Sequence, residues 1–262
     1  MALGALLTNN SELAKEAYAK ATLAPRTQTS VDLMQIGYVM NGTLHGSVEE
    51  SLHICFDGTA PKVVKVIDED EMMRTQSFLD AAVNDLPIGA QIPDHTNHVI
   101  TFSLYRVHGK CLTIMPLLPA TLEHIKRLCV GDAQKLLRQM IMALSFIHDH
   151  GFAHMDVKPS NICINGEGDF ILADLGSMAL FGKHTKSTTP YVPKDLQIPR
   201  MVSAIKTDFW MLAMTLGERL CGLDRGTATP EPSRAELIVQ LNAHEGARTI
   251  IGDLIARLEL ET

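Results

Sequence analysis

The sequence contains few cysteines, and their placement excludes a cysteine-based framework. Its 262 residues include five cysteines, widely dispersed and without a Cys-x-x-Cys pair: Cys55, Cys111, Cys129, Cys163 and Cys221. An odd, dispersed set argues against both a disulfide scaffold and a structural zinc site. We therefore expect a reducing intracellular location, in the cytoplasm or the nucleus.

Basic charge and long apolar runs are also scarce. Lys and Arg number 23 against 30 Asp and Glu, which gives a net charge of −7. A nucleic-acid partner is not expected, because binding to a phosphate backbone needs a concentrated basic face. No membrane association is expected either, because the apolar start at residues 1–7 is too short to span a bilayer and has no basic leader.

What the chain does have is apolar material for a sizeable core. Hydrophobic residues make up 46% of it, without a glycine or proline bias, which excludes disordered and fibrous classes. The front half reads mostly as strands. After a helix over 11–24, β-like runs are expected from about 33 to 66, a helix over 69–85, and strands over 98–105 and 111–115.

The back half reads mostly as helix. Helices are expected over 122–128, 133–150, 209–220 and 234–260, with short strands at 161–164 and 170–172. A β-rich front and a helical back predict an α+β fold of two lobes that meet near residues 115–120. The expected organisation is a helical extension over 1–30, a small lobe over 31–115 and a larger lobe over 116–262.

The most informative segment is residues 154–161, with the sequence HMDVKPSN, followed by ADLG at 173–176. These segments resemble the eukaryotic protein kinase family, whose catalytic-loop and metal-binding motifs read H-R-D-x-x-x-x-N and D-F-G. The interval from Asp156 to Asn161 is the one that the loop motif requires. The resemblance implies a bilobal kinase-like fold over 31–262, with a β-rich N-lobe and a mainly helical C-lobe whose distal helices are abbreviated.

Four further elements follow the order found in this family. Lys65, in the run VVKV, resembles the strand lysine that neutralises ATP phosphates; the alternative is a solvated lysine on an edge strand. Residues 115–118 resemble the hinge between lobes, and residues 187–195 resemble the end of an activation segment, where Asp195 would pair with Arg248. Residues 208–213 resemble the start of a buried central helix, whose Asp208 would brace the catalytic-loop backbone.

The resemblance implies an ATP-dependent serine/threonine protein kinase, a transferase acting on protein hydroxyls. Asp156 would orient the attacking hydroxyl, and Lys158 would offset charge on the phosphoryl group and accompany serine/threonine specificity. Asn161 and Asp174 would hold Mg²⁺, or alternatively Mn²⁺. Lys65 would hold the α- and β-phosphates of ATP. The remaining ATP contacts would come from Gly46, Val48, Met115, Pro116 and Leu118.

Two departures from the family pattern carry expectations of their own. The glycine-rich loop is degraded: of Asn41, Thr43 and Gly46 at the three glycine positions, one is glycine, so fewer backbone N–H groups can approach phosphate closely. Met155 replaces the arginine that normally pairs with a phosphorylated activation segment. We therefore expect activity that does not depend on phosphorylation of Thr188 or Thr189.

Several side chains are assigned from their local context. The acid that pairs with Lys65 is expected to be Asp80, with Asp85 as the alternative. Leu175, in place of phenylalanine, should still act as an apolar plug. His154 should be a packed structural residue and His148 a surface or turn residue, and this assignment is favoured over a zinc site built from the histidines at 148, 150 and 154.

Two other functions fit parts of the pattern. A pseudokinase that binds ATP or scaffolds partners would explain the degraded loop, although retention of Lys65, Asp156, Asn161 and Asp174 weighs against it. A small-molecule kinase would share the catalytic loop but not residues 191–195 followed by the run DFW at 208–210. The chain is short for a kinase, so regulation is expected from a protein partner, from expression level or from the N-terminal helix.

Overall fold

A computed structural model describes residues 28–45, 52–82, 98–185, 191–194, 201–202, 204–222, 232–243, 250, 252 and 254 of the chain. The chain divides into two compact units. The first comprises Met1–Thr96 with Ile100–Ala120, and the second Asn97–Val99 with Thr121–Thr262. Several sequence predictions lie outside the described residues: the helix over 11–24, and the roles given to Gly46, Val48, Asp85, Thr188, Thr189, Asp195 and Arg248.

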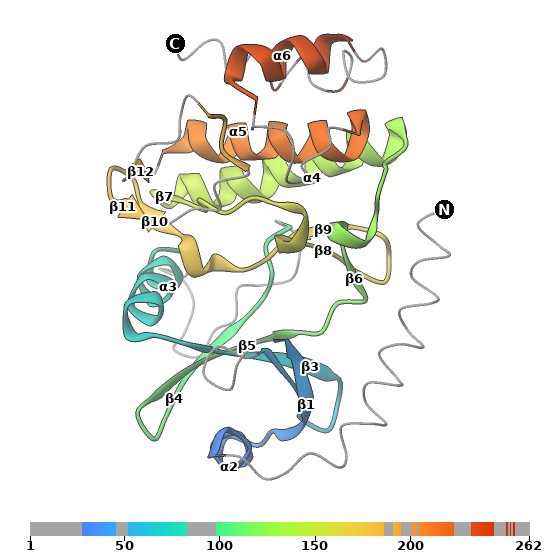
Figure 1. The fold of residues 1–262 in the computed structure, drawn as a ribbon. Helices are drawn as coiled ribbons and strands as arrows, with labels where there is room; N and C mark the ends of the chain where they lie inside the picture. The colour runs from blue at the N-terminus through green and yellow to red at the C-terminus, as the bar shows by residue number, and fades with distance from the viewer. Residues whose placement is uncertain are drawn as a thin grey trace. The chain divides into compact units, whose positions relative to one another are not determined.

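The first unit is built on a five-stranded sheet in the order β1-β2-β3-β5-β4 (Figure 1). Its strands are β1 (Val39–His45), β2 (Leu52–Phe56), β3 (Pro61–Ile67), β4 (Ser103–Val107) and β5 (Lys110–Pro116). Neighbouring strands pair antiparallel throughout. The β-branched strand β3 is central, with β2 on one side and β5 on the other, so Lys65 does not lie on an edge strand.

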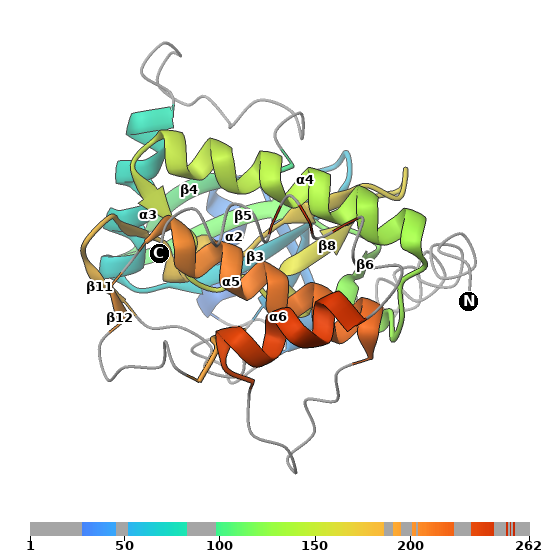
Figure 2. The same cartoon turned by 90° about the horizontal axis from the view of Figure 1, so that it is seen from above.

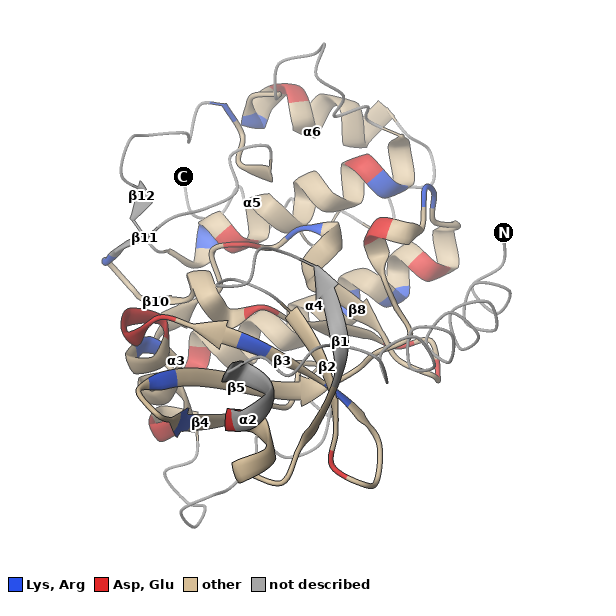
Figure 3. Ribbon diagram, turned by 60° about the horizontal axis from the view of Figure 1, so that its bottom comes forward, with Lys and Arg blue, Asp and Glu red and all other residues tan. Residues whose placement is uncertain are grey.

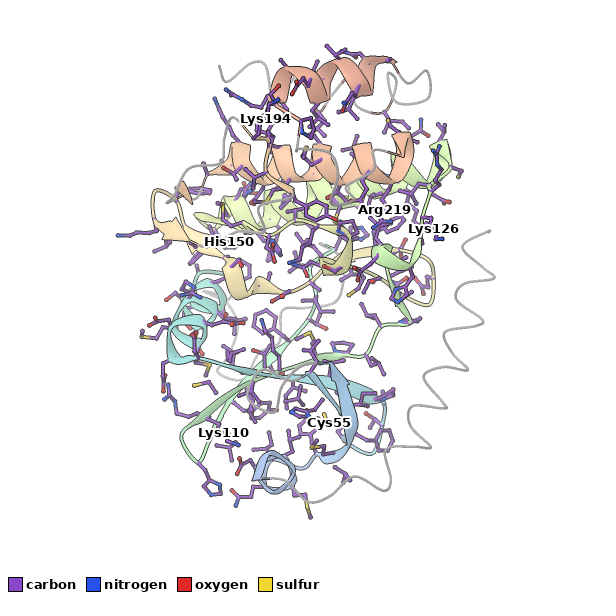
Figure 4. The ribbon with its side chains drawn as sticks, viewed as in Figure 1. Cys55, Lys110, Lys126, His150, Lys194 and Arg219 are labelled. Carbon is purple, nitrogen blue, oxygen red and sulfur yellow. The ribbon has the colours of Figure 1, made fainter. Side chains whose placement is uncertain are left out.

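A helix, α2 (Gln28–Gln35), precedes the sheet where β-like structure was expected from residue 33. That expectation was wrong for residues 33–35. Leu33 is fully buried and packs with Cys55, Val64 and Leu112 on one face of the sheet; Cys55 is labelled in Figure 4. The mostly apolar segment at 33–36, LMQI, is too short to distinguish a strand from a helix, and burial of Leu33 against the sheet favours the helix.

Helix α3 (Glu69–Ala82) follows β3 directly and confirms most of the helix expected over 69–85. Asp68 caps it, since its Oδ1 accepts the N–H of Glu71 at 2.7 Å. The first turn carries Glu69, Asp70 and Glu71, a charge that suits the positive end of a helix dipole. Figure 3 shows this acidic turn in red.

The second unit is mainly helical. Its helices are α4 (Val130–Asp149), α5 (Ile205–Leu216), the π-helical continuation η6 (Gly217–Cys221) and α6 (Arg234–Ala243). α5 lies beside α4 and α6 in both views (Figures 1 and 2). Along α4 the apolar residues at helical spacing are fully buried, including Leu136, Met140, Leu144 and Ile147. Among the described residues, no helix combines the length and the apolar character needed to cross a membrane.

Short elements connect these helices. They are β6 (Ala120–Thr121), at which the chain passes from one unit to the other, η2 (Leu122–His124), β7 (Phe152–Ala153), η3 (Pro159–Asn161), β8 (Ile162–Ile164), β9 (Phe170–Leu172), η4 (Leu175–Ser177), β10 (Ala179–Leu180), β11 (His184–Thr185) and β12 (Met201–Val202). β8 and β9 pair antiparallel with Ile162 opposite Leu172, which confirms the strands expected at 161–164 and 170–172.

The helix expected over 122–128 is wrong, because the structure has a single 3₁₀ turn at Leu122–His124. Arg219 (labelled in Figure 4) explains the difference. Its Nη1 donates to the Ile125 carbonyl at 3.0 Å, and its own carbonyl accepts the Leu128 N–H at 2.8 Å. These tertiary bonds use the backbone groups that a helix would have paired internally.

Candidate active site

The loop over residues 154–161 in the second unit places Lys158 and Asn161 against the carboxylate of Asp156. This residue lies between β7 and η3 and is 7% exposed. Its Oδ2 is 2.8 Å from Lys158 Nζ and accepts a hydrogen bond from Asn161 Nδ2 at 2.8 Å. The Asn161 amide also donates to the Asp156 carbonyl at 2.9 Å. The carboxylate is therefore held in one orientation, with a positive charge beside it.

Asp208, in the first turn of α5, braces the backbone of this loop, as predicted. The side chain is fully buried. Its Oδ1 accepts the N–H of Met155 and its Oδ2 accepts the N–H of His154, each at 2.7 Å. Met155 has a φ of +65°, a left-handed conformation that is uncommon for a residue other than glycine and needs support from its surroundings. The two bonds from Asp208 supply that support.

His148 belongs to the same network, which the sequence did not indicate. The side chain was expected at the surface or in a turn, but it is buried in the last turn of α4, with Nε2 2.9 Å from Asp208 Oδ2. Its ring meets Phe209 edge-on, at 5.5 Å between centroids. The expectation was wrong because α4 packs against α5, so a polar residue near the helix end faces a buried carboxylate.

His154 is the packed structural histidine that the sequence predicted. It is fully buried, and its Nε2 donates to the Ala173 carbonyl at 3.0 Å. Its Nδ1 accepts the N–H of Asp156 at 3.2 Å. Because a carbonyl can only accept and an amide N–H can only donate, these bonds place the ring proton on Nε2. The imidazole thereby connects the catalytic loop to the residue before Asp174.

Asn161 and Asp174 lie at the same end of the β8–β9 hairpin. Asn161 immediately precedes β8, and Asp174 is the second residue after β9. A hydrogen bond of 2.8 Å from the Ala173 N–H to the Asn161 carbonyl continues the strand pairing to this end. Asp174 has a left-handed φ of +58°, and its Oδ1 accepts the Gly176 N–H at 3.3 Å. Leu175 is buried beside it, and its role as an apolar plug stays a prediction.

The oxygen atoms at this end of the hairpin fit a magnesium ion. The Asn161 amide turns its NH₂ group towards Asp156, which leaves its oxygen on the opposite side of the amide, and Asp174 follows β9 with a carboxylate. Mg²⁺ is usually bound by one or two carboxylates together with substrate phosphates and water, rather than by a cage of protein ligands. In the part of the chain that the structure describes, no cluster of three or more His, Cys, Asp or Glu forms such a cage.

In the first unit, Lys65 forms its ion pair with a residue that the sequence analysis did not select. Lys65 Nζ is 2.9 Å from Glu71 Oε1, and both side chains are partly buried. The expected partner, Asp80, is exposed and accepts a hydrogen bond from Gln76 at 2.7 Å. The assignment to Asp80 was therefore wrong. The signal for Glu71 was the acidic run at 68–71 that begins directly after β3, which brings a glutamate close to the end of that strand.

The predicted hinge occupies the end of β5 and the residues just beyond it. Met115 pairs with Val63 and Pro116 with Lys62 across the sheet. The Leu117 N–H donates to the Pro61 carbonyl at 3.2 Å, which holds the segment to β3 beyond the strand end. Met115, Pro116 and Leu118 are all half-buried, and their contacts with adenine stay a prediction.

Comparison with known proteins identifies the class to which this fold belongs. Two solved structures share it: the granulovirus kinase PK-1 of Cydia pomonella granulovirus, with a TM-score of 0.57, 19% identity and coverage of 73% of this chain and 71% of that one, and vaccinia related kinase 3, with a TM-score of 0.61, 14% identity and coverage of 87% and 78%. The fold is the α+β protein kinase fold, with a β-rich unit and a mainly helical unit.

The family follows from the sequence. The model of the protein kinase domain matches residues 46–240, and the chain belongs to that family. Among curated proteins, it is 26% identical over 171 residues to CBL-interacting protein kinase 16 of Oryza sativa subsp. japonica. It is 25% identical over 171 residues to CBL-interacting serine/threonine-protein kinase 5 of Arabidopsis thaliana. Each match covers 61% of this chain but only 37% and 38% of the respective relative.

Proposed function

We propose that this protein is an ATP-dependent kinase that transfers the γ-phosphate of Mg-ATP to serine or threonine hydroxyls of a protein substrate. The observation that carries the proposal is the convergence of Lys158 and Asn161 on the buried carboxylate of Asp156. Phosphoryl transfer needs little covalent help from the enzyme, so positioned charge of this kind is the main requirement. Retention of the whole group favours catalysis over a pseudokinase role.

Each residue then has a defined task. Asp156 orients the acceptor hydroxyl and takes its proton, while Lys158 offsets charge on the transferred group. Asn161 and Asp174 hold Mg²⁺, or Mn²⁺ in its place, and a bound divalent ion neutralises the phosphate oxygens. Lys65, held by Glu71 at 2.9 Å, binds the α- and β-phosphates.

The adenine and the organisation of the lobes complete the proposal. Pro116 offers its carbonyl to adenine, Leu118 offers both backbone groups, and Met115 borders the site. Gly46 and Val48 belong to the loop over the phosphates. We assign residues 31–115 to the N-lobe, 116–262 to the C-lobe and 1–30 to an N-terminal extension. A regulatory protein partner is part of the proposal, in keeping with the names of the plant relatives.

Met155 supports a kinase that works without phosphorylation of its activation segment. Its side chain is fully buried, uncharged, and occupies the place where the family motif has an arginine. A buried methionine cannot pair with a phosphate, so phosphorylation of Thr188 or Thr189 would lack its usual cationic receptor at this position.

The test is transfer of label from γ-labelled ATP to generic protein substrates, followed by phosphoamino-acid analysis. The wild type should label serine and threonine, and both Asp156→Asn and Asp174→Asn should abolish labelling. Asp149→Asn, an exposed carboxylate at the end of α4, is the matched control and should retain activity. Thermal stabilisation of the wild type by Mg-ATP without transfer to any acceptor would instead establish a pseudokinase. Transfer confined to small hydroxyl compounds would establish a small-molecule kinase.

A further inference from the structure

Two cationic side chains lie on the same face of the first unit's sheet, beside the acidic first turn of α3. Lys65 of β3 pairs with Thr113 of β5, and Arg106 of β4 pairs with Cys111 of β5. Directly paired residues project to the same side of a sheet, as do residues two apart on one strand. Thr113 and Cys111 are two apart, so Lys65 and Arg106 share a face, with β5 between their strands.

Arg106 binds the first turn of α3 through Glu69. Its Nη1 bonds to one carboxylate oxygen of Glu69, and its Nη2 bonds to the other at 2.7 Å. This bidentate geometry fixes direction as well as distance. The hydrogen bonds from Arg106 lower the pKa of Glu69, so the carboxylate stays charged. Burial, and next the charge of Glu69, raise the pKa of the Cys111 thiol, which places Cys111 beside the same carboxylate.

Glu69 and Glu71 are in one turn of helix and bind two strands, β4 and β3, that are separated by β5. Glu71 bonds to Lys65 at 2.9 Å, and Asp68 fixes the start of the turn through the N–H of Glu71 at 2.7 Å. A helical turn moves as a unit, so an anchor at Glu69 restricts the rotation of Glu71 away from the sheet. Exposed ion pairs contribute little to global stability, and both Arg106 and Glu69 are more than half exposed. The bidentate Arg106–Glu69 pair is therefore better explained by holding the turn in position than by adding to global stability.

We propose that Arg106 is a positioning residue which, through Glu69, holds the first turn of α3 against the sheet and so maintains the Lys65–Glu71 pair. The proposal rests on the proposed kinase function for its consequence, because that pair must be in place for ATP to be held productively. Both contacts that carry the proposal, Lys65 with Glu71 and Arg106 with Glu69, lie inside the first unit.

The experiment compares two carboxylate-to-amide changes on the same helix. Glu69→Gln removes the anchor, and Asp80→Asn removes a carboxylate whose observed partner is Gln76. Glu69→Gln and Arg106→Met should each raise the KM for ATP about threefold or more, with free energies of unfolding near that of the wild type. Asp80→Asn should leave both quantities unchanged. Arg106→Lys should restore part of the loss, and the exchanged pair Arg106→Glu with Glu69→Arg should restore most of it.

A second readout needs no nucleotide and no catalysis. Hydrogen exchange at the amides of Glu71 and Met72, both bonded to Asp68, reports opening of the first turn. Exchange there should be faster in Glu69→Gln than in Asp80→Asn. Unchanged exchange and unchanged KM in Glu69→Gln would overturn the proposal, as would an exchanged pair that behaves like Arg106→Met. If exchange is faster in Glu69→Gln but the wild type transfers no phosphate, the positioning role would be supported and the kinase function contradicted.

Discussion

The buried carboxylate of Asp208 holds the peptide nitrogen of Met155 at 2.7 Å while Met155 occupies a left-handed conformation. The bond connects the first turn of α5 to the residue immediately before Asp156. Because the neighbouring His154 N–H and His148 Nε2 share the same carboxylate, three parts of the second unit meet there. The orientation of the loop that carries Asp156 thus depends on the buried carboxylate of Asp208.

Replacing Asp208 with asparagine should therefore damage both the fold and the rate. One acceptor oxygen becomes an NH₂ group that faces donors, which leaves buried groups unpaired at a cost of about 1–3 kcal/mol. Denaturant unfolding measures the loss, and Asp149→Asn, with an exposed carboxylate, should cost far less. A variant as stable and as active as the wild type would contradict the bracing role.

Glu71→Gln should weaken ATP binding, whereas Asp80→Asn should not. Glu71 is the partner of Lys65, and loss of its charge frees the lysine to leave the phosphate position. The shift in melting temperature on adding Mg-ATP measures the effect, and Lys65→Met gives the reference for complete loss. If Asp80→Asn reduced the shift and Glu71→Gln did not, the pairing seen in the structure would be the wrong one for nucleotide binding.

Acid should weaken the contacts that hold Asp169, in the turn of the β8–β9 hairpin, to Lys135 and Gln139 of α4. Hydrogen bonds from Lys135, and next from Gln139 at 2.8 Å, lower the pKa of Asp169. Because the pKa of Asp169 is lower in the folded protein than in the unfolded one, its carboxylate stabilises the fold at pH values above about 4. That contribution is lost as the pH falls through the lowered pKa. The free energies of unfolding of wild type and Asp169→Asn should therefore converge as the pH falls. A constant difference from neutral to strongly acidic pH would contradict this assignment.

Phosphorylation of Thr188 and Thr189 should be dispensable. Treatment of the purified protein with phosphatase should leave turnover largely unchanged, because Met155 provides no cation to receive a phosphate. Alanine at both positions should give the same result. A collapse of the rate after phosphatase treatment would show that another cation reads the modification.

The motifs with strict spacing were predictable because their chemistry acts over a few residues. The interval from Asp156 to Asn161 is closed by a direct hydrogen bond between the two side chains. The strand at 170–172 was expected at the bounds observed, because a short apolar run marks it locally.

Features that depend on distant contacts could not be predicted in this way. The segment 122–128 has apolar residues at helical spacing, but Arg219, far along the chain, binds the Ile125 carbonyl and the Leu128 N–H that a continuous helix would have paired. The local sequence predicts a surface residue at a helix end for His148, whereas in the structure it contacts Asp208 of α5. From the sequence, Asp80 was selected instead of Glu71 because the pattern does not show which side of α3 meets the sheet. In the structure that side is fixed by the cap at Asp68 and by the bond from Arg106 to Glu69.

The most direct test of the account is the single-turnover rate of phosphoryl transfer from Mg-ATP to a serine or threonine acceptor, in the wild type and in Asp156→Asn. Mg-ATP affinity should be similar in the two proteins, because Asp156 is proposed to act on the acceptor hydroxyl. The account predicts a loss in rate of about a hundredfold or more in the variant. Equal rates in the two proteins would contradict it.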